Sequence, residues 1–438
     1  MTTTNKRCRS LWIGIVLFSV CFLVVQQLRQ LLFIVKSSSS EEDHNTIPPE
    51  ETTFSTSQRS TTTKSLIPIV QGKERPTCAE KGCLYIYWTG KPIIPTMYLA
   101  CIESAVKVFG QSNVIVVSNI LATAVHDVSI TTSTKMMRST KQQQQENDRD
   151  QQVILSMIST IRDWFPTIWN LTKYDLVDEI LVDSYMPQHT KNVTLWTNFL
   201  HSIKSSLAHE ADFIRIALVY LYGGMYGDID SIWIKSIPIV YPTTNNIDSS
   251  SNIHTTTTTT TTTSNTTNPK KTLFRVRVDL RKRRDGKLVH TRDYNYTSNA
   301  IVGGIKQSKF YREVLSLMPY SYDPKVWTCI GENILIPSIS KCNCVTDFVE
   351  VEYKDMYGIY GYDAPKYYTT KLDVDNQHDD RKILLHVLKN SKQLHLFGSK
   401  TKADHDAVPV HGSLYYHVLQ TLNLTTQVNF TTTTSSTT

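Results

Sequence analysis

The chain has 438 residues, of which 40% are hydrophobic and 19% are charged, and its formal net charge is +7 at pH 7. That length could hold two or three average domains, or one enzyme core with long extensions. The charge is modest for this length, and the basic residues are scattered except for the run Arg281–Arg284, so we do not expect a nucleic-acid-binding protein.

The first predicted element is an apolar segment at residues 11–35. Its length is close to the ~20 residues that span a bilayer. Lys6, Arg7 and Arg9 precede it, which favours a cytosolic N-terminus and a luminal location for the rest of the chain. We therefore predict a cytosolic tail at residues 1–10, a transmembrane signal anchor at 11–35 and a single-pass type II topology. A cleaved signal peptide is the alternative.

Several residues after this segment agree with a luminal location. Six asparagines lie in N-glycosylation sequons: Asn170, Asn192, Asn265, Asn295, Asn423 and Asn429. Six cysteines also follow, and in an oxidising compartment they favour disulfides over metal ligation: Cys78, Cys83, Cys101, Cys329, Cys342 and Cys344. A bridge between Cys78 and Cys83, and one from Cys329 to Cys342 or Cys344, would be local, but the sequence leaves the connectivity open.

Composition divides the remaining chain into a folded domain and low-complexity segments. Residues 36–77 are rich in Ser and Thr and predict a disordered stalk. The predicted luminal domain is 78–425, with polar insertions at about 130–152 and 243–270 that contain too few apolar residues to join a core. A Thr-rich tail follows at 426–438.

Within the domain, apolar patterns predict alternating strands and helices. Leu84–Gly90 is typical of a strand, Met97–Phe109 of a helix and Asn113–Asn119 of a second buried strand, an order that indicates an α/β fold with a parallel sheet. Ile180–Tyr185 is a further candidate strand. Asn198–Leu221 has the apolar spacing of one helix.

Two alternating stretches, LFRVRVDL and LVHTRDYNY, flank the basic run Arg281–Arg284 and a turn signal at Asp285 and Gly286. This pattern predicts a β-hairpin with a solvated tip. A site for acidic ligands or membrane headgroups is the alternative.

The segment LVYLYGGMYGDIDSIWI, residues 218–234, carries the clearest chemical signal. Asp228 and Asp230 would share one face of a strand, or lie at its end where the geometry is looser. Their repulsion and desolvation require compensation. Mn²⁺ or Mg²⁺ would provide it, because hard cations take oxygen ligands. A surface loop without metal is the alternative.

The helix before this segment adds a second pair. Asp212 and Arg215 are three residues apart, so they can pair with each other on the helix surface or with a ligand. Gly223 and Gly224 would let the chain turn sharply after the helix.

The stretch ADFIRIALVYLYGGMYGDIDSIWIKSI resembles the signature of DXD-containing glycosyltransferases. It is most similar to the alpha-1,4-glycosyltransferase family, which includes lactosylceramide 4-alpha-galactosyltransferase and alpha-1,4-N-acetylglucosaminyltransferase. Other stretches resemble further segments of that family: IYWTG, ACIESAVKVFG, SNAIVGGIKQSKFYREVL, WTCIGENILIPSISKCNC, DMYGIYGYDAPKYY and KQLHLFGSKT.

The resemblance implies a GT-A-like, Rossmann-type nucleotide-sugar transferase fold with the ligand at the carboxyl ends of parallel strands. It implies a Golgi type II membrane enzyme that transfers a hexose or N-acetylhexosamine to a glycolipid or glycoprotein glycan. Galactose from UDP-galactose, in a retaining, Mn²⁺-dependent alpha-1,4 transfer, is the leading expectation. The alternatives are an alpha-mannosyltransferase using GDP-mannose and a catalytically silent luminal binding homologue.

The resemblance also implies roles for individual residues. Asp228 and Asp230 are the predicted catalytic residues and would hold the metal and the nucleotide diphosphate. His395 is a predicted metal or diphosphate contact, with a packed core histidine as the alternative. The predicted nucleotide-sugar residues are Asp212, Arg215, Gly223, Gly224 and Tyr226. The predicted acceptor-side residues are Asn299, Gly331 and Glu332.

Three positions depart from the family pattern. Gly227 replaces a larger residue, which suggests extra space beside the metal. Glu332 replaces a proline and Phe397 replaces a tryptophan. These departures leave the identities of the donor sugar and the acceptor open.

Overall fold

The computed structural model describes only residues of the unit Lys64–Thr438. The described ranges are 67–78, 83–131, 152–237, 272–284, 287–326, 329–375, 377–401 and 407–426. In these ranges no helix is both long and apolar enough to cross a membrane. The predicted anchor lies outside them, as do most of the stalk, most of the first insertion, all of the second insertion and the Thr-rich tail beyond residue 426, so these remain predictions.

An eight-stranded sheet has the order β1-β4-β3-β2-β5-β8-β7-β9. Its first five strands are mutually parallel: β1 (Ile69–Gln71), β4 (Thr167–Asn170), β3 (Val114–Val117), β2 (Leu84–Tyr87) and β5 (Gly224–Gly227). The other three are β8 (Lys287–Gly304), antiparallel to β5 and β7; β7 (Leu273–Arg284); and β9 (Phe348–Glu352), parallel to β7. This mixed sheet confirms the α/β class.

The chain passes outward from β2 to β3 and β4 and then returns to the other side of β2 as β5. The crevice outside the carboxyl ends of β2 and β5 is therefore a topological switch point, where ligands bind in open α/β sheets.

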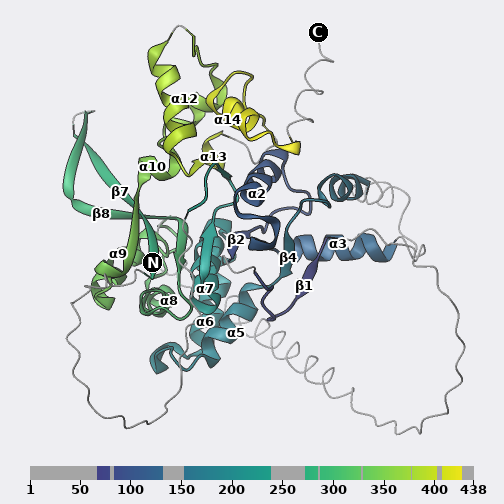
Figure 1. Ribbon diagram of the computed structural model, residues 1–438. Helices are drawn as coiled ribbons and strands as arrows, with labels where there is room; N and C mark the ends of the chain where they lie inside the picture. Colours follow the sequence, from purple (N-terminus) through teal and green to yellow (C-terminus); the bar gives the residue numbers. More distant parts are fainter. Residues whose placement is uncertain are drawn as a thin grey trace, which may run out of the picture. The chain divides into compact units, whose positions relative to one another are not determined.

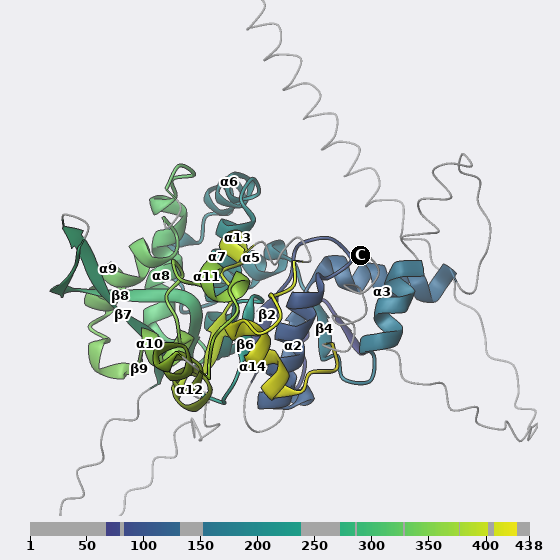
Figure 2. The same cartoon turned by 90° about the horizontal axis from the view of Figure 1, so that it is seen from above.

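Side chains alternate between the two faces of the sheet because successive strand residues point to opposite sides. Leu84 and Ile86 of β2 belong to one apolar cluster with helix α2 (Thr96–Phe109) and the N-terminal half of α3 (Asn119–Thr131). Tyr85 and Tyr87 belong to a second cluster on the other face. That cluster contains helices α5 (Lys173–Val182), α6 (Val193–Ile203) and α7 (Leu207–Tyr222). Figure 2 shows α2 and α7 on opposite sides of β2.

The C-terminal part adds helices, of which α12, α13 and α14 are labelled in Figure 1, and one strand of a small second sheet. Further helices are α8 (Lys309–Ser321), α9 (Glu332–Cys342), α10 (Tyr353–Tyr357), α11 (Ala364–Thr369), α12 (His378–Asn390), α13 (Gly398–Thr401) and α14 (Leu414–Leu422), with 3-10 turns at Gln111–Asn113, Gln188–Thr190 and Val345–Asp347. The second sheet pairs β6 (Ser231–Trp233) with β10 (Gln393–His395) in antiparallel register.

The predicted strand, helix and strand at 84–119 are confirmed as β2, α2 and β3. The predicted hairpin is also confirmed as β7 and β8, although its turn at residues 285–286 and the side chains of the basic run are outside the described part. Whether that tip binds anions therefore stays a prediction.

Two element predictions are wrong. Ile180–Tyr185 is not a strand, because α5 continues to Val182. Thr172 and Asp175 form a capping box at the start of α5, a local signal that a short apolar run does not reveal. The predicted helix over Asn198–Leu221 is two helices, since α6 ends at Ile203 and Ser206 caps a new helix by accepting a hydrogen bond from His209 N–H.

The predicted bridge Cys78–Cys83 is confirmed. The predicted bridge from Cys329 is wrong, because Cys342 pairs with Cys344. Cys329 and Cys101 are buried free thiols.

The double glycine after α7 is confirmed as a sharp turn. Gly223 and Gly224 have φ angles of +68° and +98°, a region that favours glycine. A Cβ at Gly224 would lie 2.7 Å from the Cys83 carbonyl oxygen, so β5 also approaches the start of β2 too closely for a side chain.

We predict that Gly224→Ala lowers the unfolding free energy by about 2–5 kcal/mol, combining the cost of positive φ with the overlap at Cys83. Gly72→Ala is the matched control, because Gly72 has a φ of +67° with no heavy atom within 4 Å of the added Cβ. It should cost only about 1–2 kcal/mol. Urea denaturation compares the two, and equal losses would show that the contact with Cys83 is unimportant.

Candidate active site

Asp228 and Asp230 lie in a break between two strands. Asp228 directly follows β5, and its N–H donates to the Ala300 carbonyl of β8 at 3.0 Å. Asp230 directly precedes β6, and its carbonyl accepts from Leu396 N–H at 2.7 Å. Of the two predicted arrangements, the strand-end position is therefore confirmed, and the motif joins the large sheet to the small one.

Each carboxylate uses one oxygen to contact a fixed donor. Asp228 Oδ1 lies 3.1 Å from Arg215 Nη2, and Asp230 Oδ2 accepts from Gly398 N–H at 3.0 Å. The other oxygens, Asp228 Oδ2 and Asp230 Oδ1, lie 3.8 Å and 3.3 Å from His395 Nε2. One ligand atom from each of these three residues falls within a 4.8 Å group, so the predicted set of Asp228, Asp230 and His395 is brought together.

Strand pairing places His395 in this group. In the β6–β10 sheet, His395 is opposite Ser231, the residue that follows Asp230. A second contact fixes β6 from the other side, because Ser104 Oγ on α2 accepts from Trp233 N–H at 2.8 Å. The pairing therefore connects residues more than 160 positions apart in the sequence.

The histidine ring presents a donor to the carboxylates. His395 Nδ1 accepts from Phe397 N–H at 3.0 Å, so the neutral ring carries its proton on Nε2. Burial alone would lower the pKa of His395, but Asp230 and Asp228 outweigh burial and raise the pKa above its ordinary value.

The donor atoms of these residues decide whether the divalent metal that the family resemblance implies fits the site. The carboxylate oxygens of Asp228 and Asp230 suit Mn²⁺ or Mg²⁺, which prefer oxygen ligands. His395 fits less well as a ligand, because Nε2 would have to lose the proton that the Phe397 N–H directs to it. The residues fit a cation held by the two aspartates, with His395 as a neighbouring hydrogen-bond donor.

Arg215 links the motif to the preceding helix. Its Nη2 lies 3.2 Å from Asp212 Oδ1 and 3.1 Å from Asp228 Oδ1, and its guanidinium lies 5.0 Å from the centroid of the Tyr226 ring. Asp212 and Arg215 are 6% and 5% exposed, so a surface ion pair is excluded. Burial raises the pKa of Asp212 to about 7, although the charge of Arg215 lowers it.

Two of the three predicted acceptor-side residues, Asn299 and Gly331, lie at the same network. Asn299 Nδ2 donates to Asp212 Oδ1 at 2.8 Å, and its carbonyl accepts from Arg215 Nη1. A Cβ at Gly331 would lie 2.3 Å from Asn299 Nδ2 and 3.3 Å from Asp212 Oδ2. Glu332 begins α9, and its side chain is outside the described part. Asn299 thus holds Asp212 by a hydrogen bond, and Gly331 allows the backbone to lie close to both side chains.

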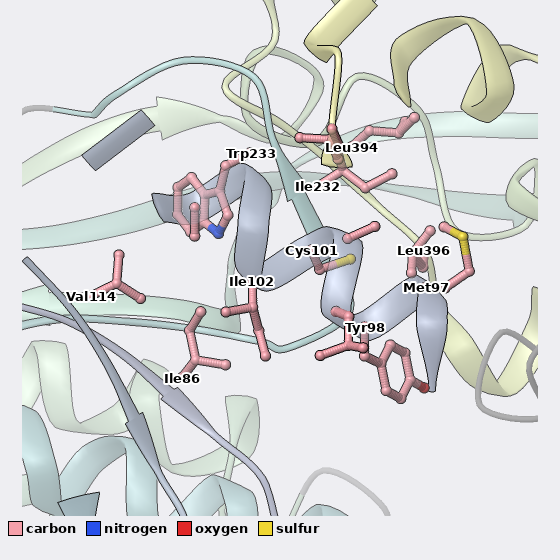
Figure 3. Packing of buried hydrophobic residues seen from close by; sticks show 14 of the residues in the cluster. Ile86, Met97, Tyr98, Cys101, Ile102, Val114, Ile232, Trp233, Leu394 and Leu396 are labelled. Atoms are coloured by element: carbon pink, nitrogen blue, oxygen red, sulfur yellow. The ribbon is translucent and has the colours of Figure 1, made fainter. Parts of the chain in front are cut away.

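Three glycine predictions need correction. Gly224 lies at the opposite end of β5 from Asp228, roughly 13 Å away at the usual strand rise, and Gly223 precedes it, so the two glycines turn the chain and do not line the site. Gly227 does not leave space beside the metal, because a Cβ there would lie 2.7 Å from Trp233 Cζ2. Figure 3 shows Trp233 packed in the apolar cluster with Ile102.

The sequence did not identify two contributors to the site. Gly398 supplies the N–H to Asp230, and a Cβ there would lie 2.5 Å from Tyr98 Oη. Tyr357 is fully buried, and its ring makes an edge contact with His395 at a centroid distance of 5.5 Å. Both lie in the two C-terminal stretches that carry the family resemblance, which is the signal that could have identified them.

Residues 100–254 match the family described as "Glycosyltransferase sugar-binding region containing DXD motif". The match confirms, for this part of the chain, the predicted resemblance to DXD-containing glycosyltransferases. Proteins of this family generally use a divalent metal and a nucleotide sugar, and glycosyltransferases act on a glycan acceptor.

Several solved structures are distantly similar to the chain. They include the PaToxG glycosyltransferase (15% identity, TM-score 0.33, 60% of this chain and 68% of that chain) and the ligand-free glycosyltransferase domain from the YGT toxin (9% identity, TM-score 0.36, 74% of this chain and 99% of that chain). These likenesses are too weak to define the substrate. No curated protein matches the chain by sequence.

We predict that Arg215→Met lowers the unfolding free energy by about 3–5 kcal/mol, because it leaves the buried Asp212 without its cation beside Asp228. Urea denaturation measures the loss. Lys73→Met is the control, since the Lys73–Asp178 pair is exposed, and it should cost less than about 1 kcal/mol. A loss at Arg215 no larger than the loss at Lys73 would contradict the proposed importance of the buried network.

Proposed function

We propose that the protein is a metal-dependent glycosyltransferase that uses a nucleotide-sugar donor. One observation supports this above the others: Asp228 Oδ2 and Asp230 Oδ1 converge at the strand break, while Arg215 and the Gly398 N–H hold the opposite oxygens. Two fixed carboxylates at the switch point of a sheet suit a cation that binds a diphosphate.

In the proposed site, Asp228 and Asp230 hold Mn²⁺ or Mg²⁺. When bound, the cation supplies positive charge beside the departing nucleoside diphosphate. Arg215 orients the Asp228 carboxylate, and the Gly398 N–H orients the Asp230 carboxylate. His395 directs its Nε2–H toward the same space and would donate to a diphosphate oxygen, which is the second of its two predicted roles.

The finer assignment follows the family resemblance. We propose a GT-A-like enzyme with UDP-galactose as donor, a retaining alpha-1,4 transfer and a glycolipid or glycoprotein glycan as acceptor. The apolar segment at residues 11–35 and the sequons support a type II Golgi membrane protein.

The decisive test incubates the purified full-length protein with UDP-galactose, UDP-N-acetylgalactosamine, UDP-N-acetylglucosamine, UDP-glucose and GDP-mannose, with and without Mn²⁺. We predict Mn²⁺-dependent hydrolysis or transfer, fastest with UDP-galactose. Preference for GDP-mannose would select the mannosyltransferase alternative. No turnover of any donor, and no binding of UDP or Mn²⁺ by calorimetry, would instead support the silent binding homologue.

We predict that Asp230→Ala lowers the turnover of the preferred donor by at least about 100-fold, because it removes one carboxylate from the metal position. Asp163→Ala is the control, since the Asp163 carboxylate is 87% exposed and pairs only with its neighbour Arg162 among the described contacts. Unchanged turnover in Asp230→Ala would contradict the proposal.

A calorimetric experiment separates the two roles of His395. We predict that His395→Ala changes Mn²⁺ affinity by less than about 3-fold but weakens UDP binding in the presence of Mn²⁺ by about 10-fold or more, the usual loss for a charge-assisted hydrogen bond. If Mn²⁺ affinity falls as far as it does in Asp230→Ala, His395 is a metal ligand instead.

A further inference from the structure

Three tyrosine rings stack in series beside the candidate active site, and we call them the tyrosine ladder. The rings of Tyr353 and Tyr360 have centroids 5.3 Å apart and an interplanar angle of 8°. The rings of Tyr360 and Tyr362 have centroids 5.5 Å apart and an angle of 5°. Such offset stacking holds flat rings in a fixed orientation.

The inner end of the ladder contacts the active site. Tyr353 makes an edge contact with Tyr357, with centroids 4.7 Å apart, and Tyr357 makes an edge contact with His395. Tyr357 is fixed in turn, because its hydroxyl lies 2.8 Å from Ser298 Oγ. Ring contacts therefore run without interruption from His395 to Tyr362.

A backbone contact fixes the ladder a second time. Gly361 lies between two of the ladder residues, and a Cβ there would be 2.8 Å from Phe397 Cε1. The Phe397 ring lies 4.2 Å from the His395 ring, centroid to centroid. Phe397 has a φ of +52°, a region that a phenylalanine rarely adopts and that is typical of functional sites. The ladder segment is thus packed directly on the residue whose N–H orients His395.

The outer end of the ladder is open to solvent. Tyr362 is 58% exposed, whereas Tyr353 and Tyr360 are half-buried. A rigidly supported and exposed aromatic ring suits a ligand with one apolar face and many hydroxyl groups. A pyranose ring has these properties, because its C–H face packs on the aromatic ring while its hydroxyls can bond to water or to the tyrosine hydroxyl.

We propose that the tyrosine ladder is a sugar-binding subsite in which Tyr362 packs against a pyranose ring of the acceptor glycan. This inference rests on the proposed function and extends it to the acceptor. Its basis is the continuous series of ring contacts from His395 to Tyr362. This series connects the exposed Tyr362 ring to the site where the sugar would be transferred to the acceptor.

The test is saturation-transfer NMR on the full-length protein in detergent, with UDP and Mn²⁺ present and galactose, glucose, mannose and N-acetylglucosamine as probes. We expect at least one sugar to show contact with the wild-type protein. Tyr362→Ala should weaken that sugar's affinity by about 3- to 10-fold. Tyr362→Phe should nearly retain it, because the ring is preserved.

Tyr185→Ala is the matched control, since Tyr185 is 57% exposed and is outside the ladder. It should leave sugar binding unchanged. Hydrolysis of the preferred nucleotide sugar by water is measured in parallel as the readout of the donor site.

The outcomes are distinguishable. If the wild-type protein hydrolyses no nucleotide sugar, the proposed function fails. If hydrolysis is intact but no probe sugar contacts the protein, or if Tyr362→Ala binds sugar as wild type does, the ladder is not an acceptor subsite. An equal loss in Tyr185→Ala would also overturn the inference.

Discussion

Two carboxylates one residue apart repel each other, and holding Asp228 and Asp230 together is the constraint on which the site depends. Two donors hold one oxygen of each carboxylate: Arg215 bridges Asp228 Oδ1 to Asp212, and the Gly398 N–H donates to Asp230 Oδ2. The other two oxygens, Asp228 Oδ2 and Asp230 Oδ1, lie beside His395. Because Asp228 Oδ1 and Asp230 Oδ2 are already bonded, a divalent metal ion would meet preoriented ligands and not two mobile side chains.

The parts that meet this constraint come from distant segments of the chain. Helix α7 supplies Arg215 from one face of the sheet, and α2 supplies Ser104, which fixes β6, from the other. Pairing of β6 with β10 then sets His395 opposite the residue after Asp230. The same C-terminal segment continues into Phe397, against which Gly361 packs, so the candidate metal position and the tyrosine ladder share one support.

The sequence predicted the features that depend on local pattern or on motif spacing. The βαβ unit at 84–119 and the hairpin β7–β8 are of this kind. The grouping of His395 with Asp228 and Asp230 was instead implied by the family resemblance. Prediction from the sequence failed where a helix cap or a tertiary contact decides the local structure. The capping box at Thr172 starts helix α5, which includes part of the apolar run Ile180–Tyr185 that was predicted as a strand. The Trp233 indole fills the space that the missing side chain of Gly227 was predicted to leave. The positive φ of Phe397 likewise has no sequence signal, since phenylalanine rarely adopts it.

We propose that the two aspartates hold the cation and that His395 lies beside it as a hydrogen-bond donor. Anomalous diffraction from crystals grown with Mn²⁺ and UDP would locate the cation. We predict a manganese peak bonded to carboxylate oxygens of both Asp228 and Asp230, with the Phe397 N–H still donating to His395 Nδ1. A peak at another place in the protein, or one bonded to His395 Nε2 with either carboxylate turned away, would contradict it.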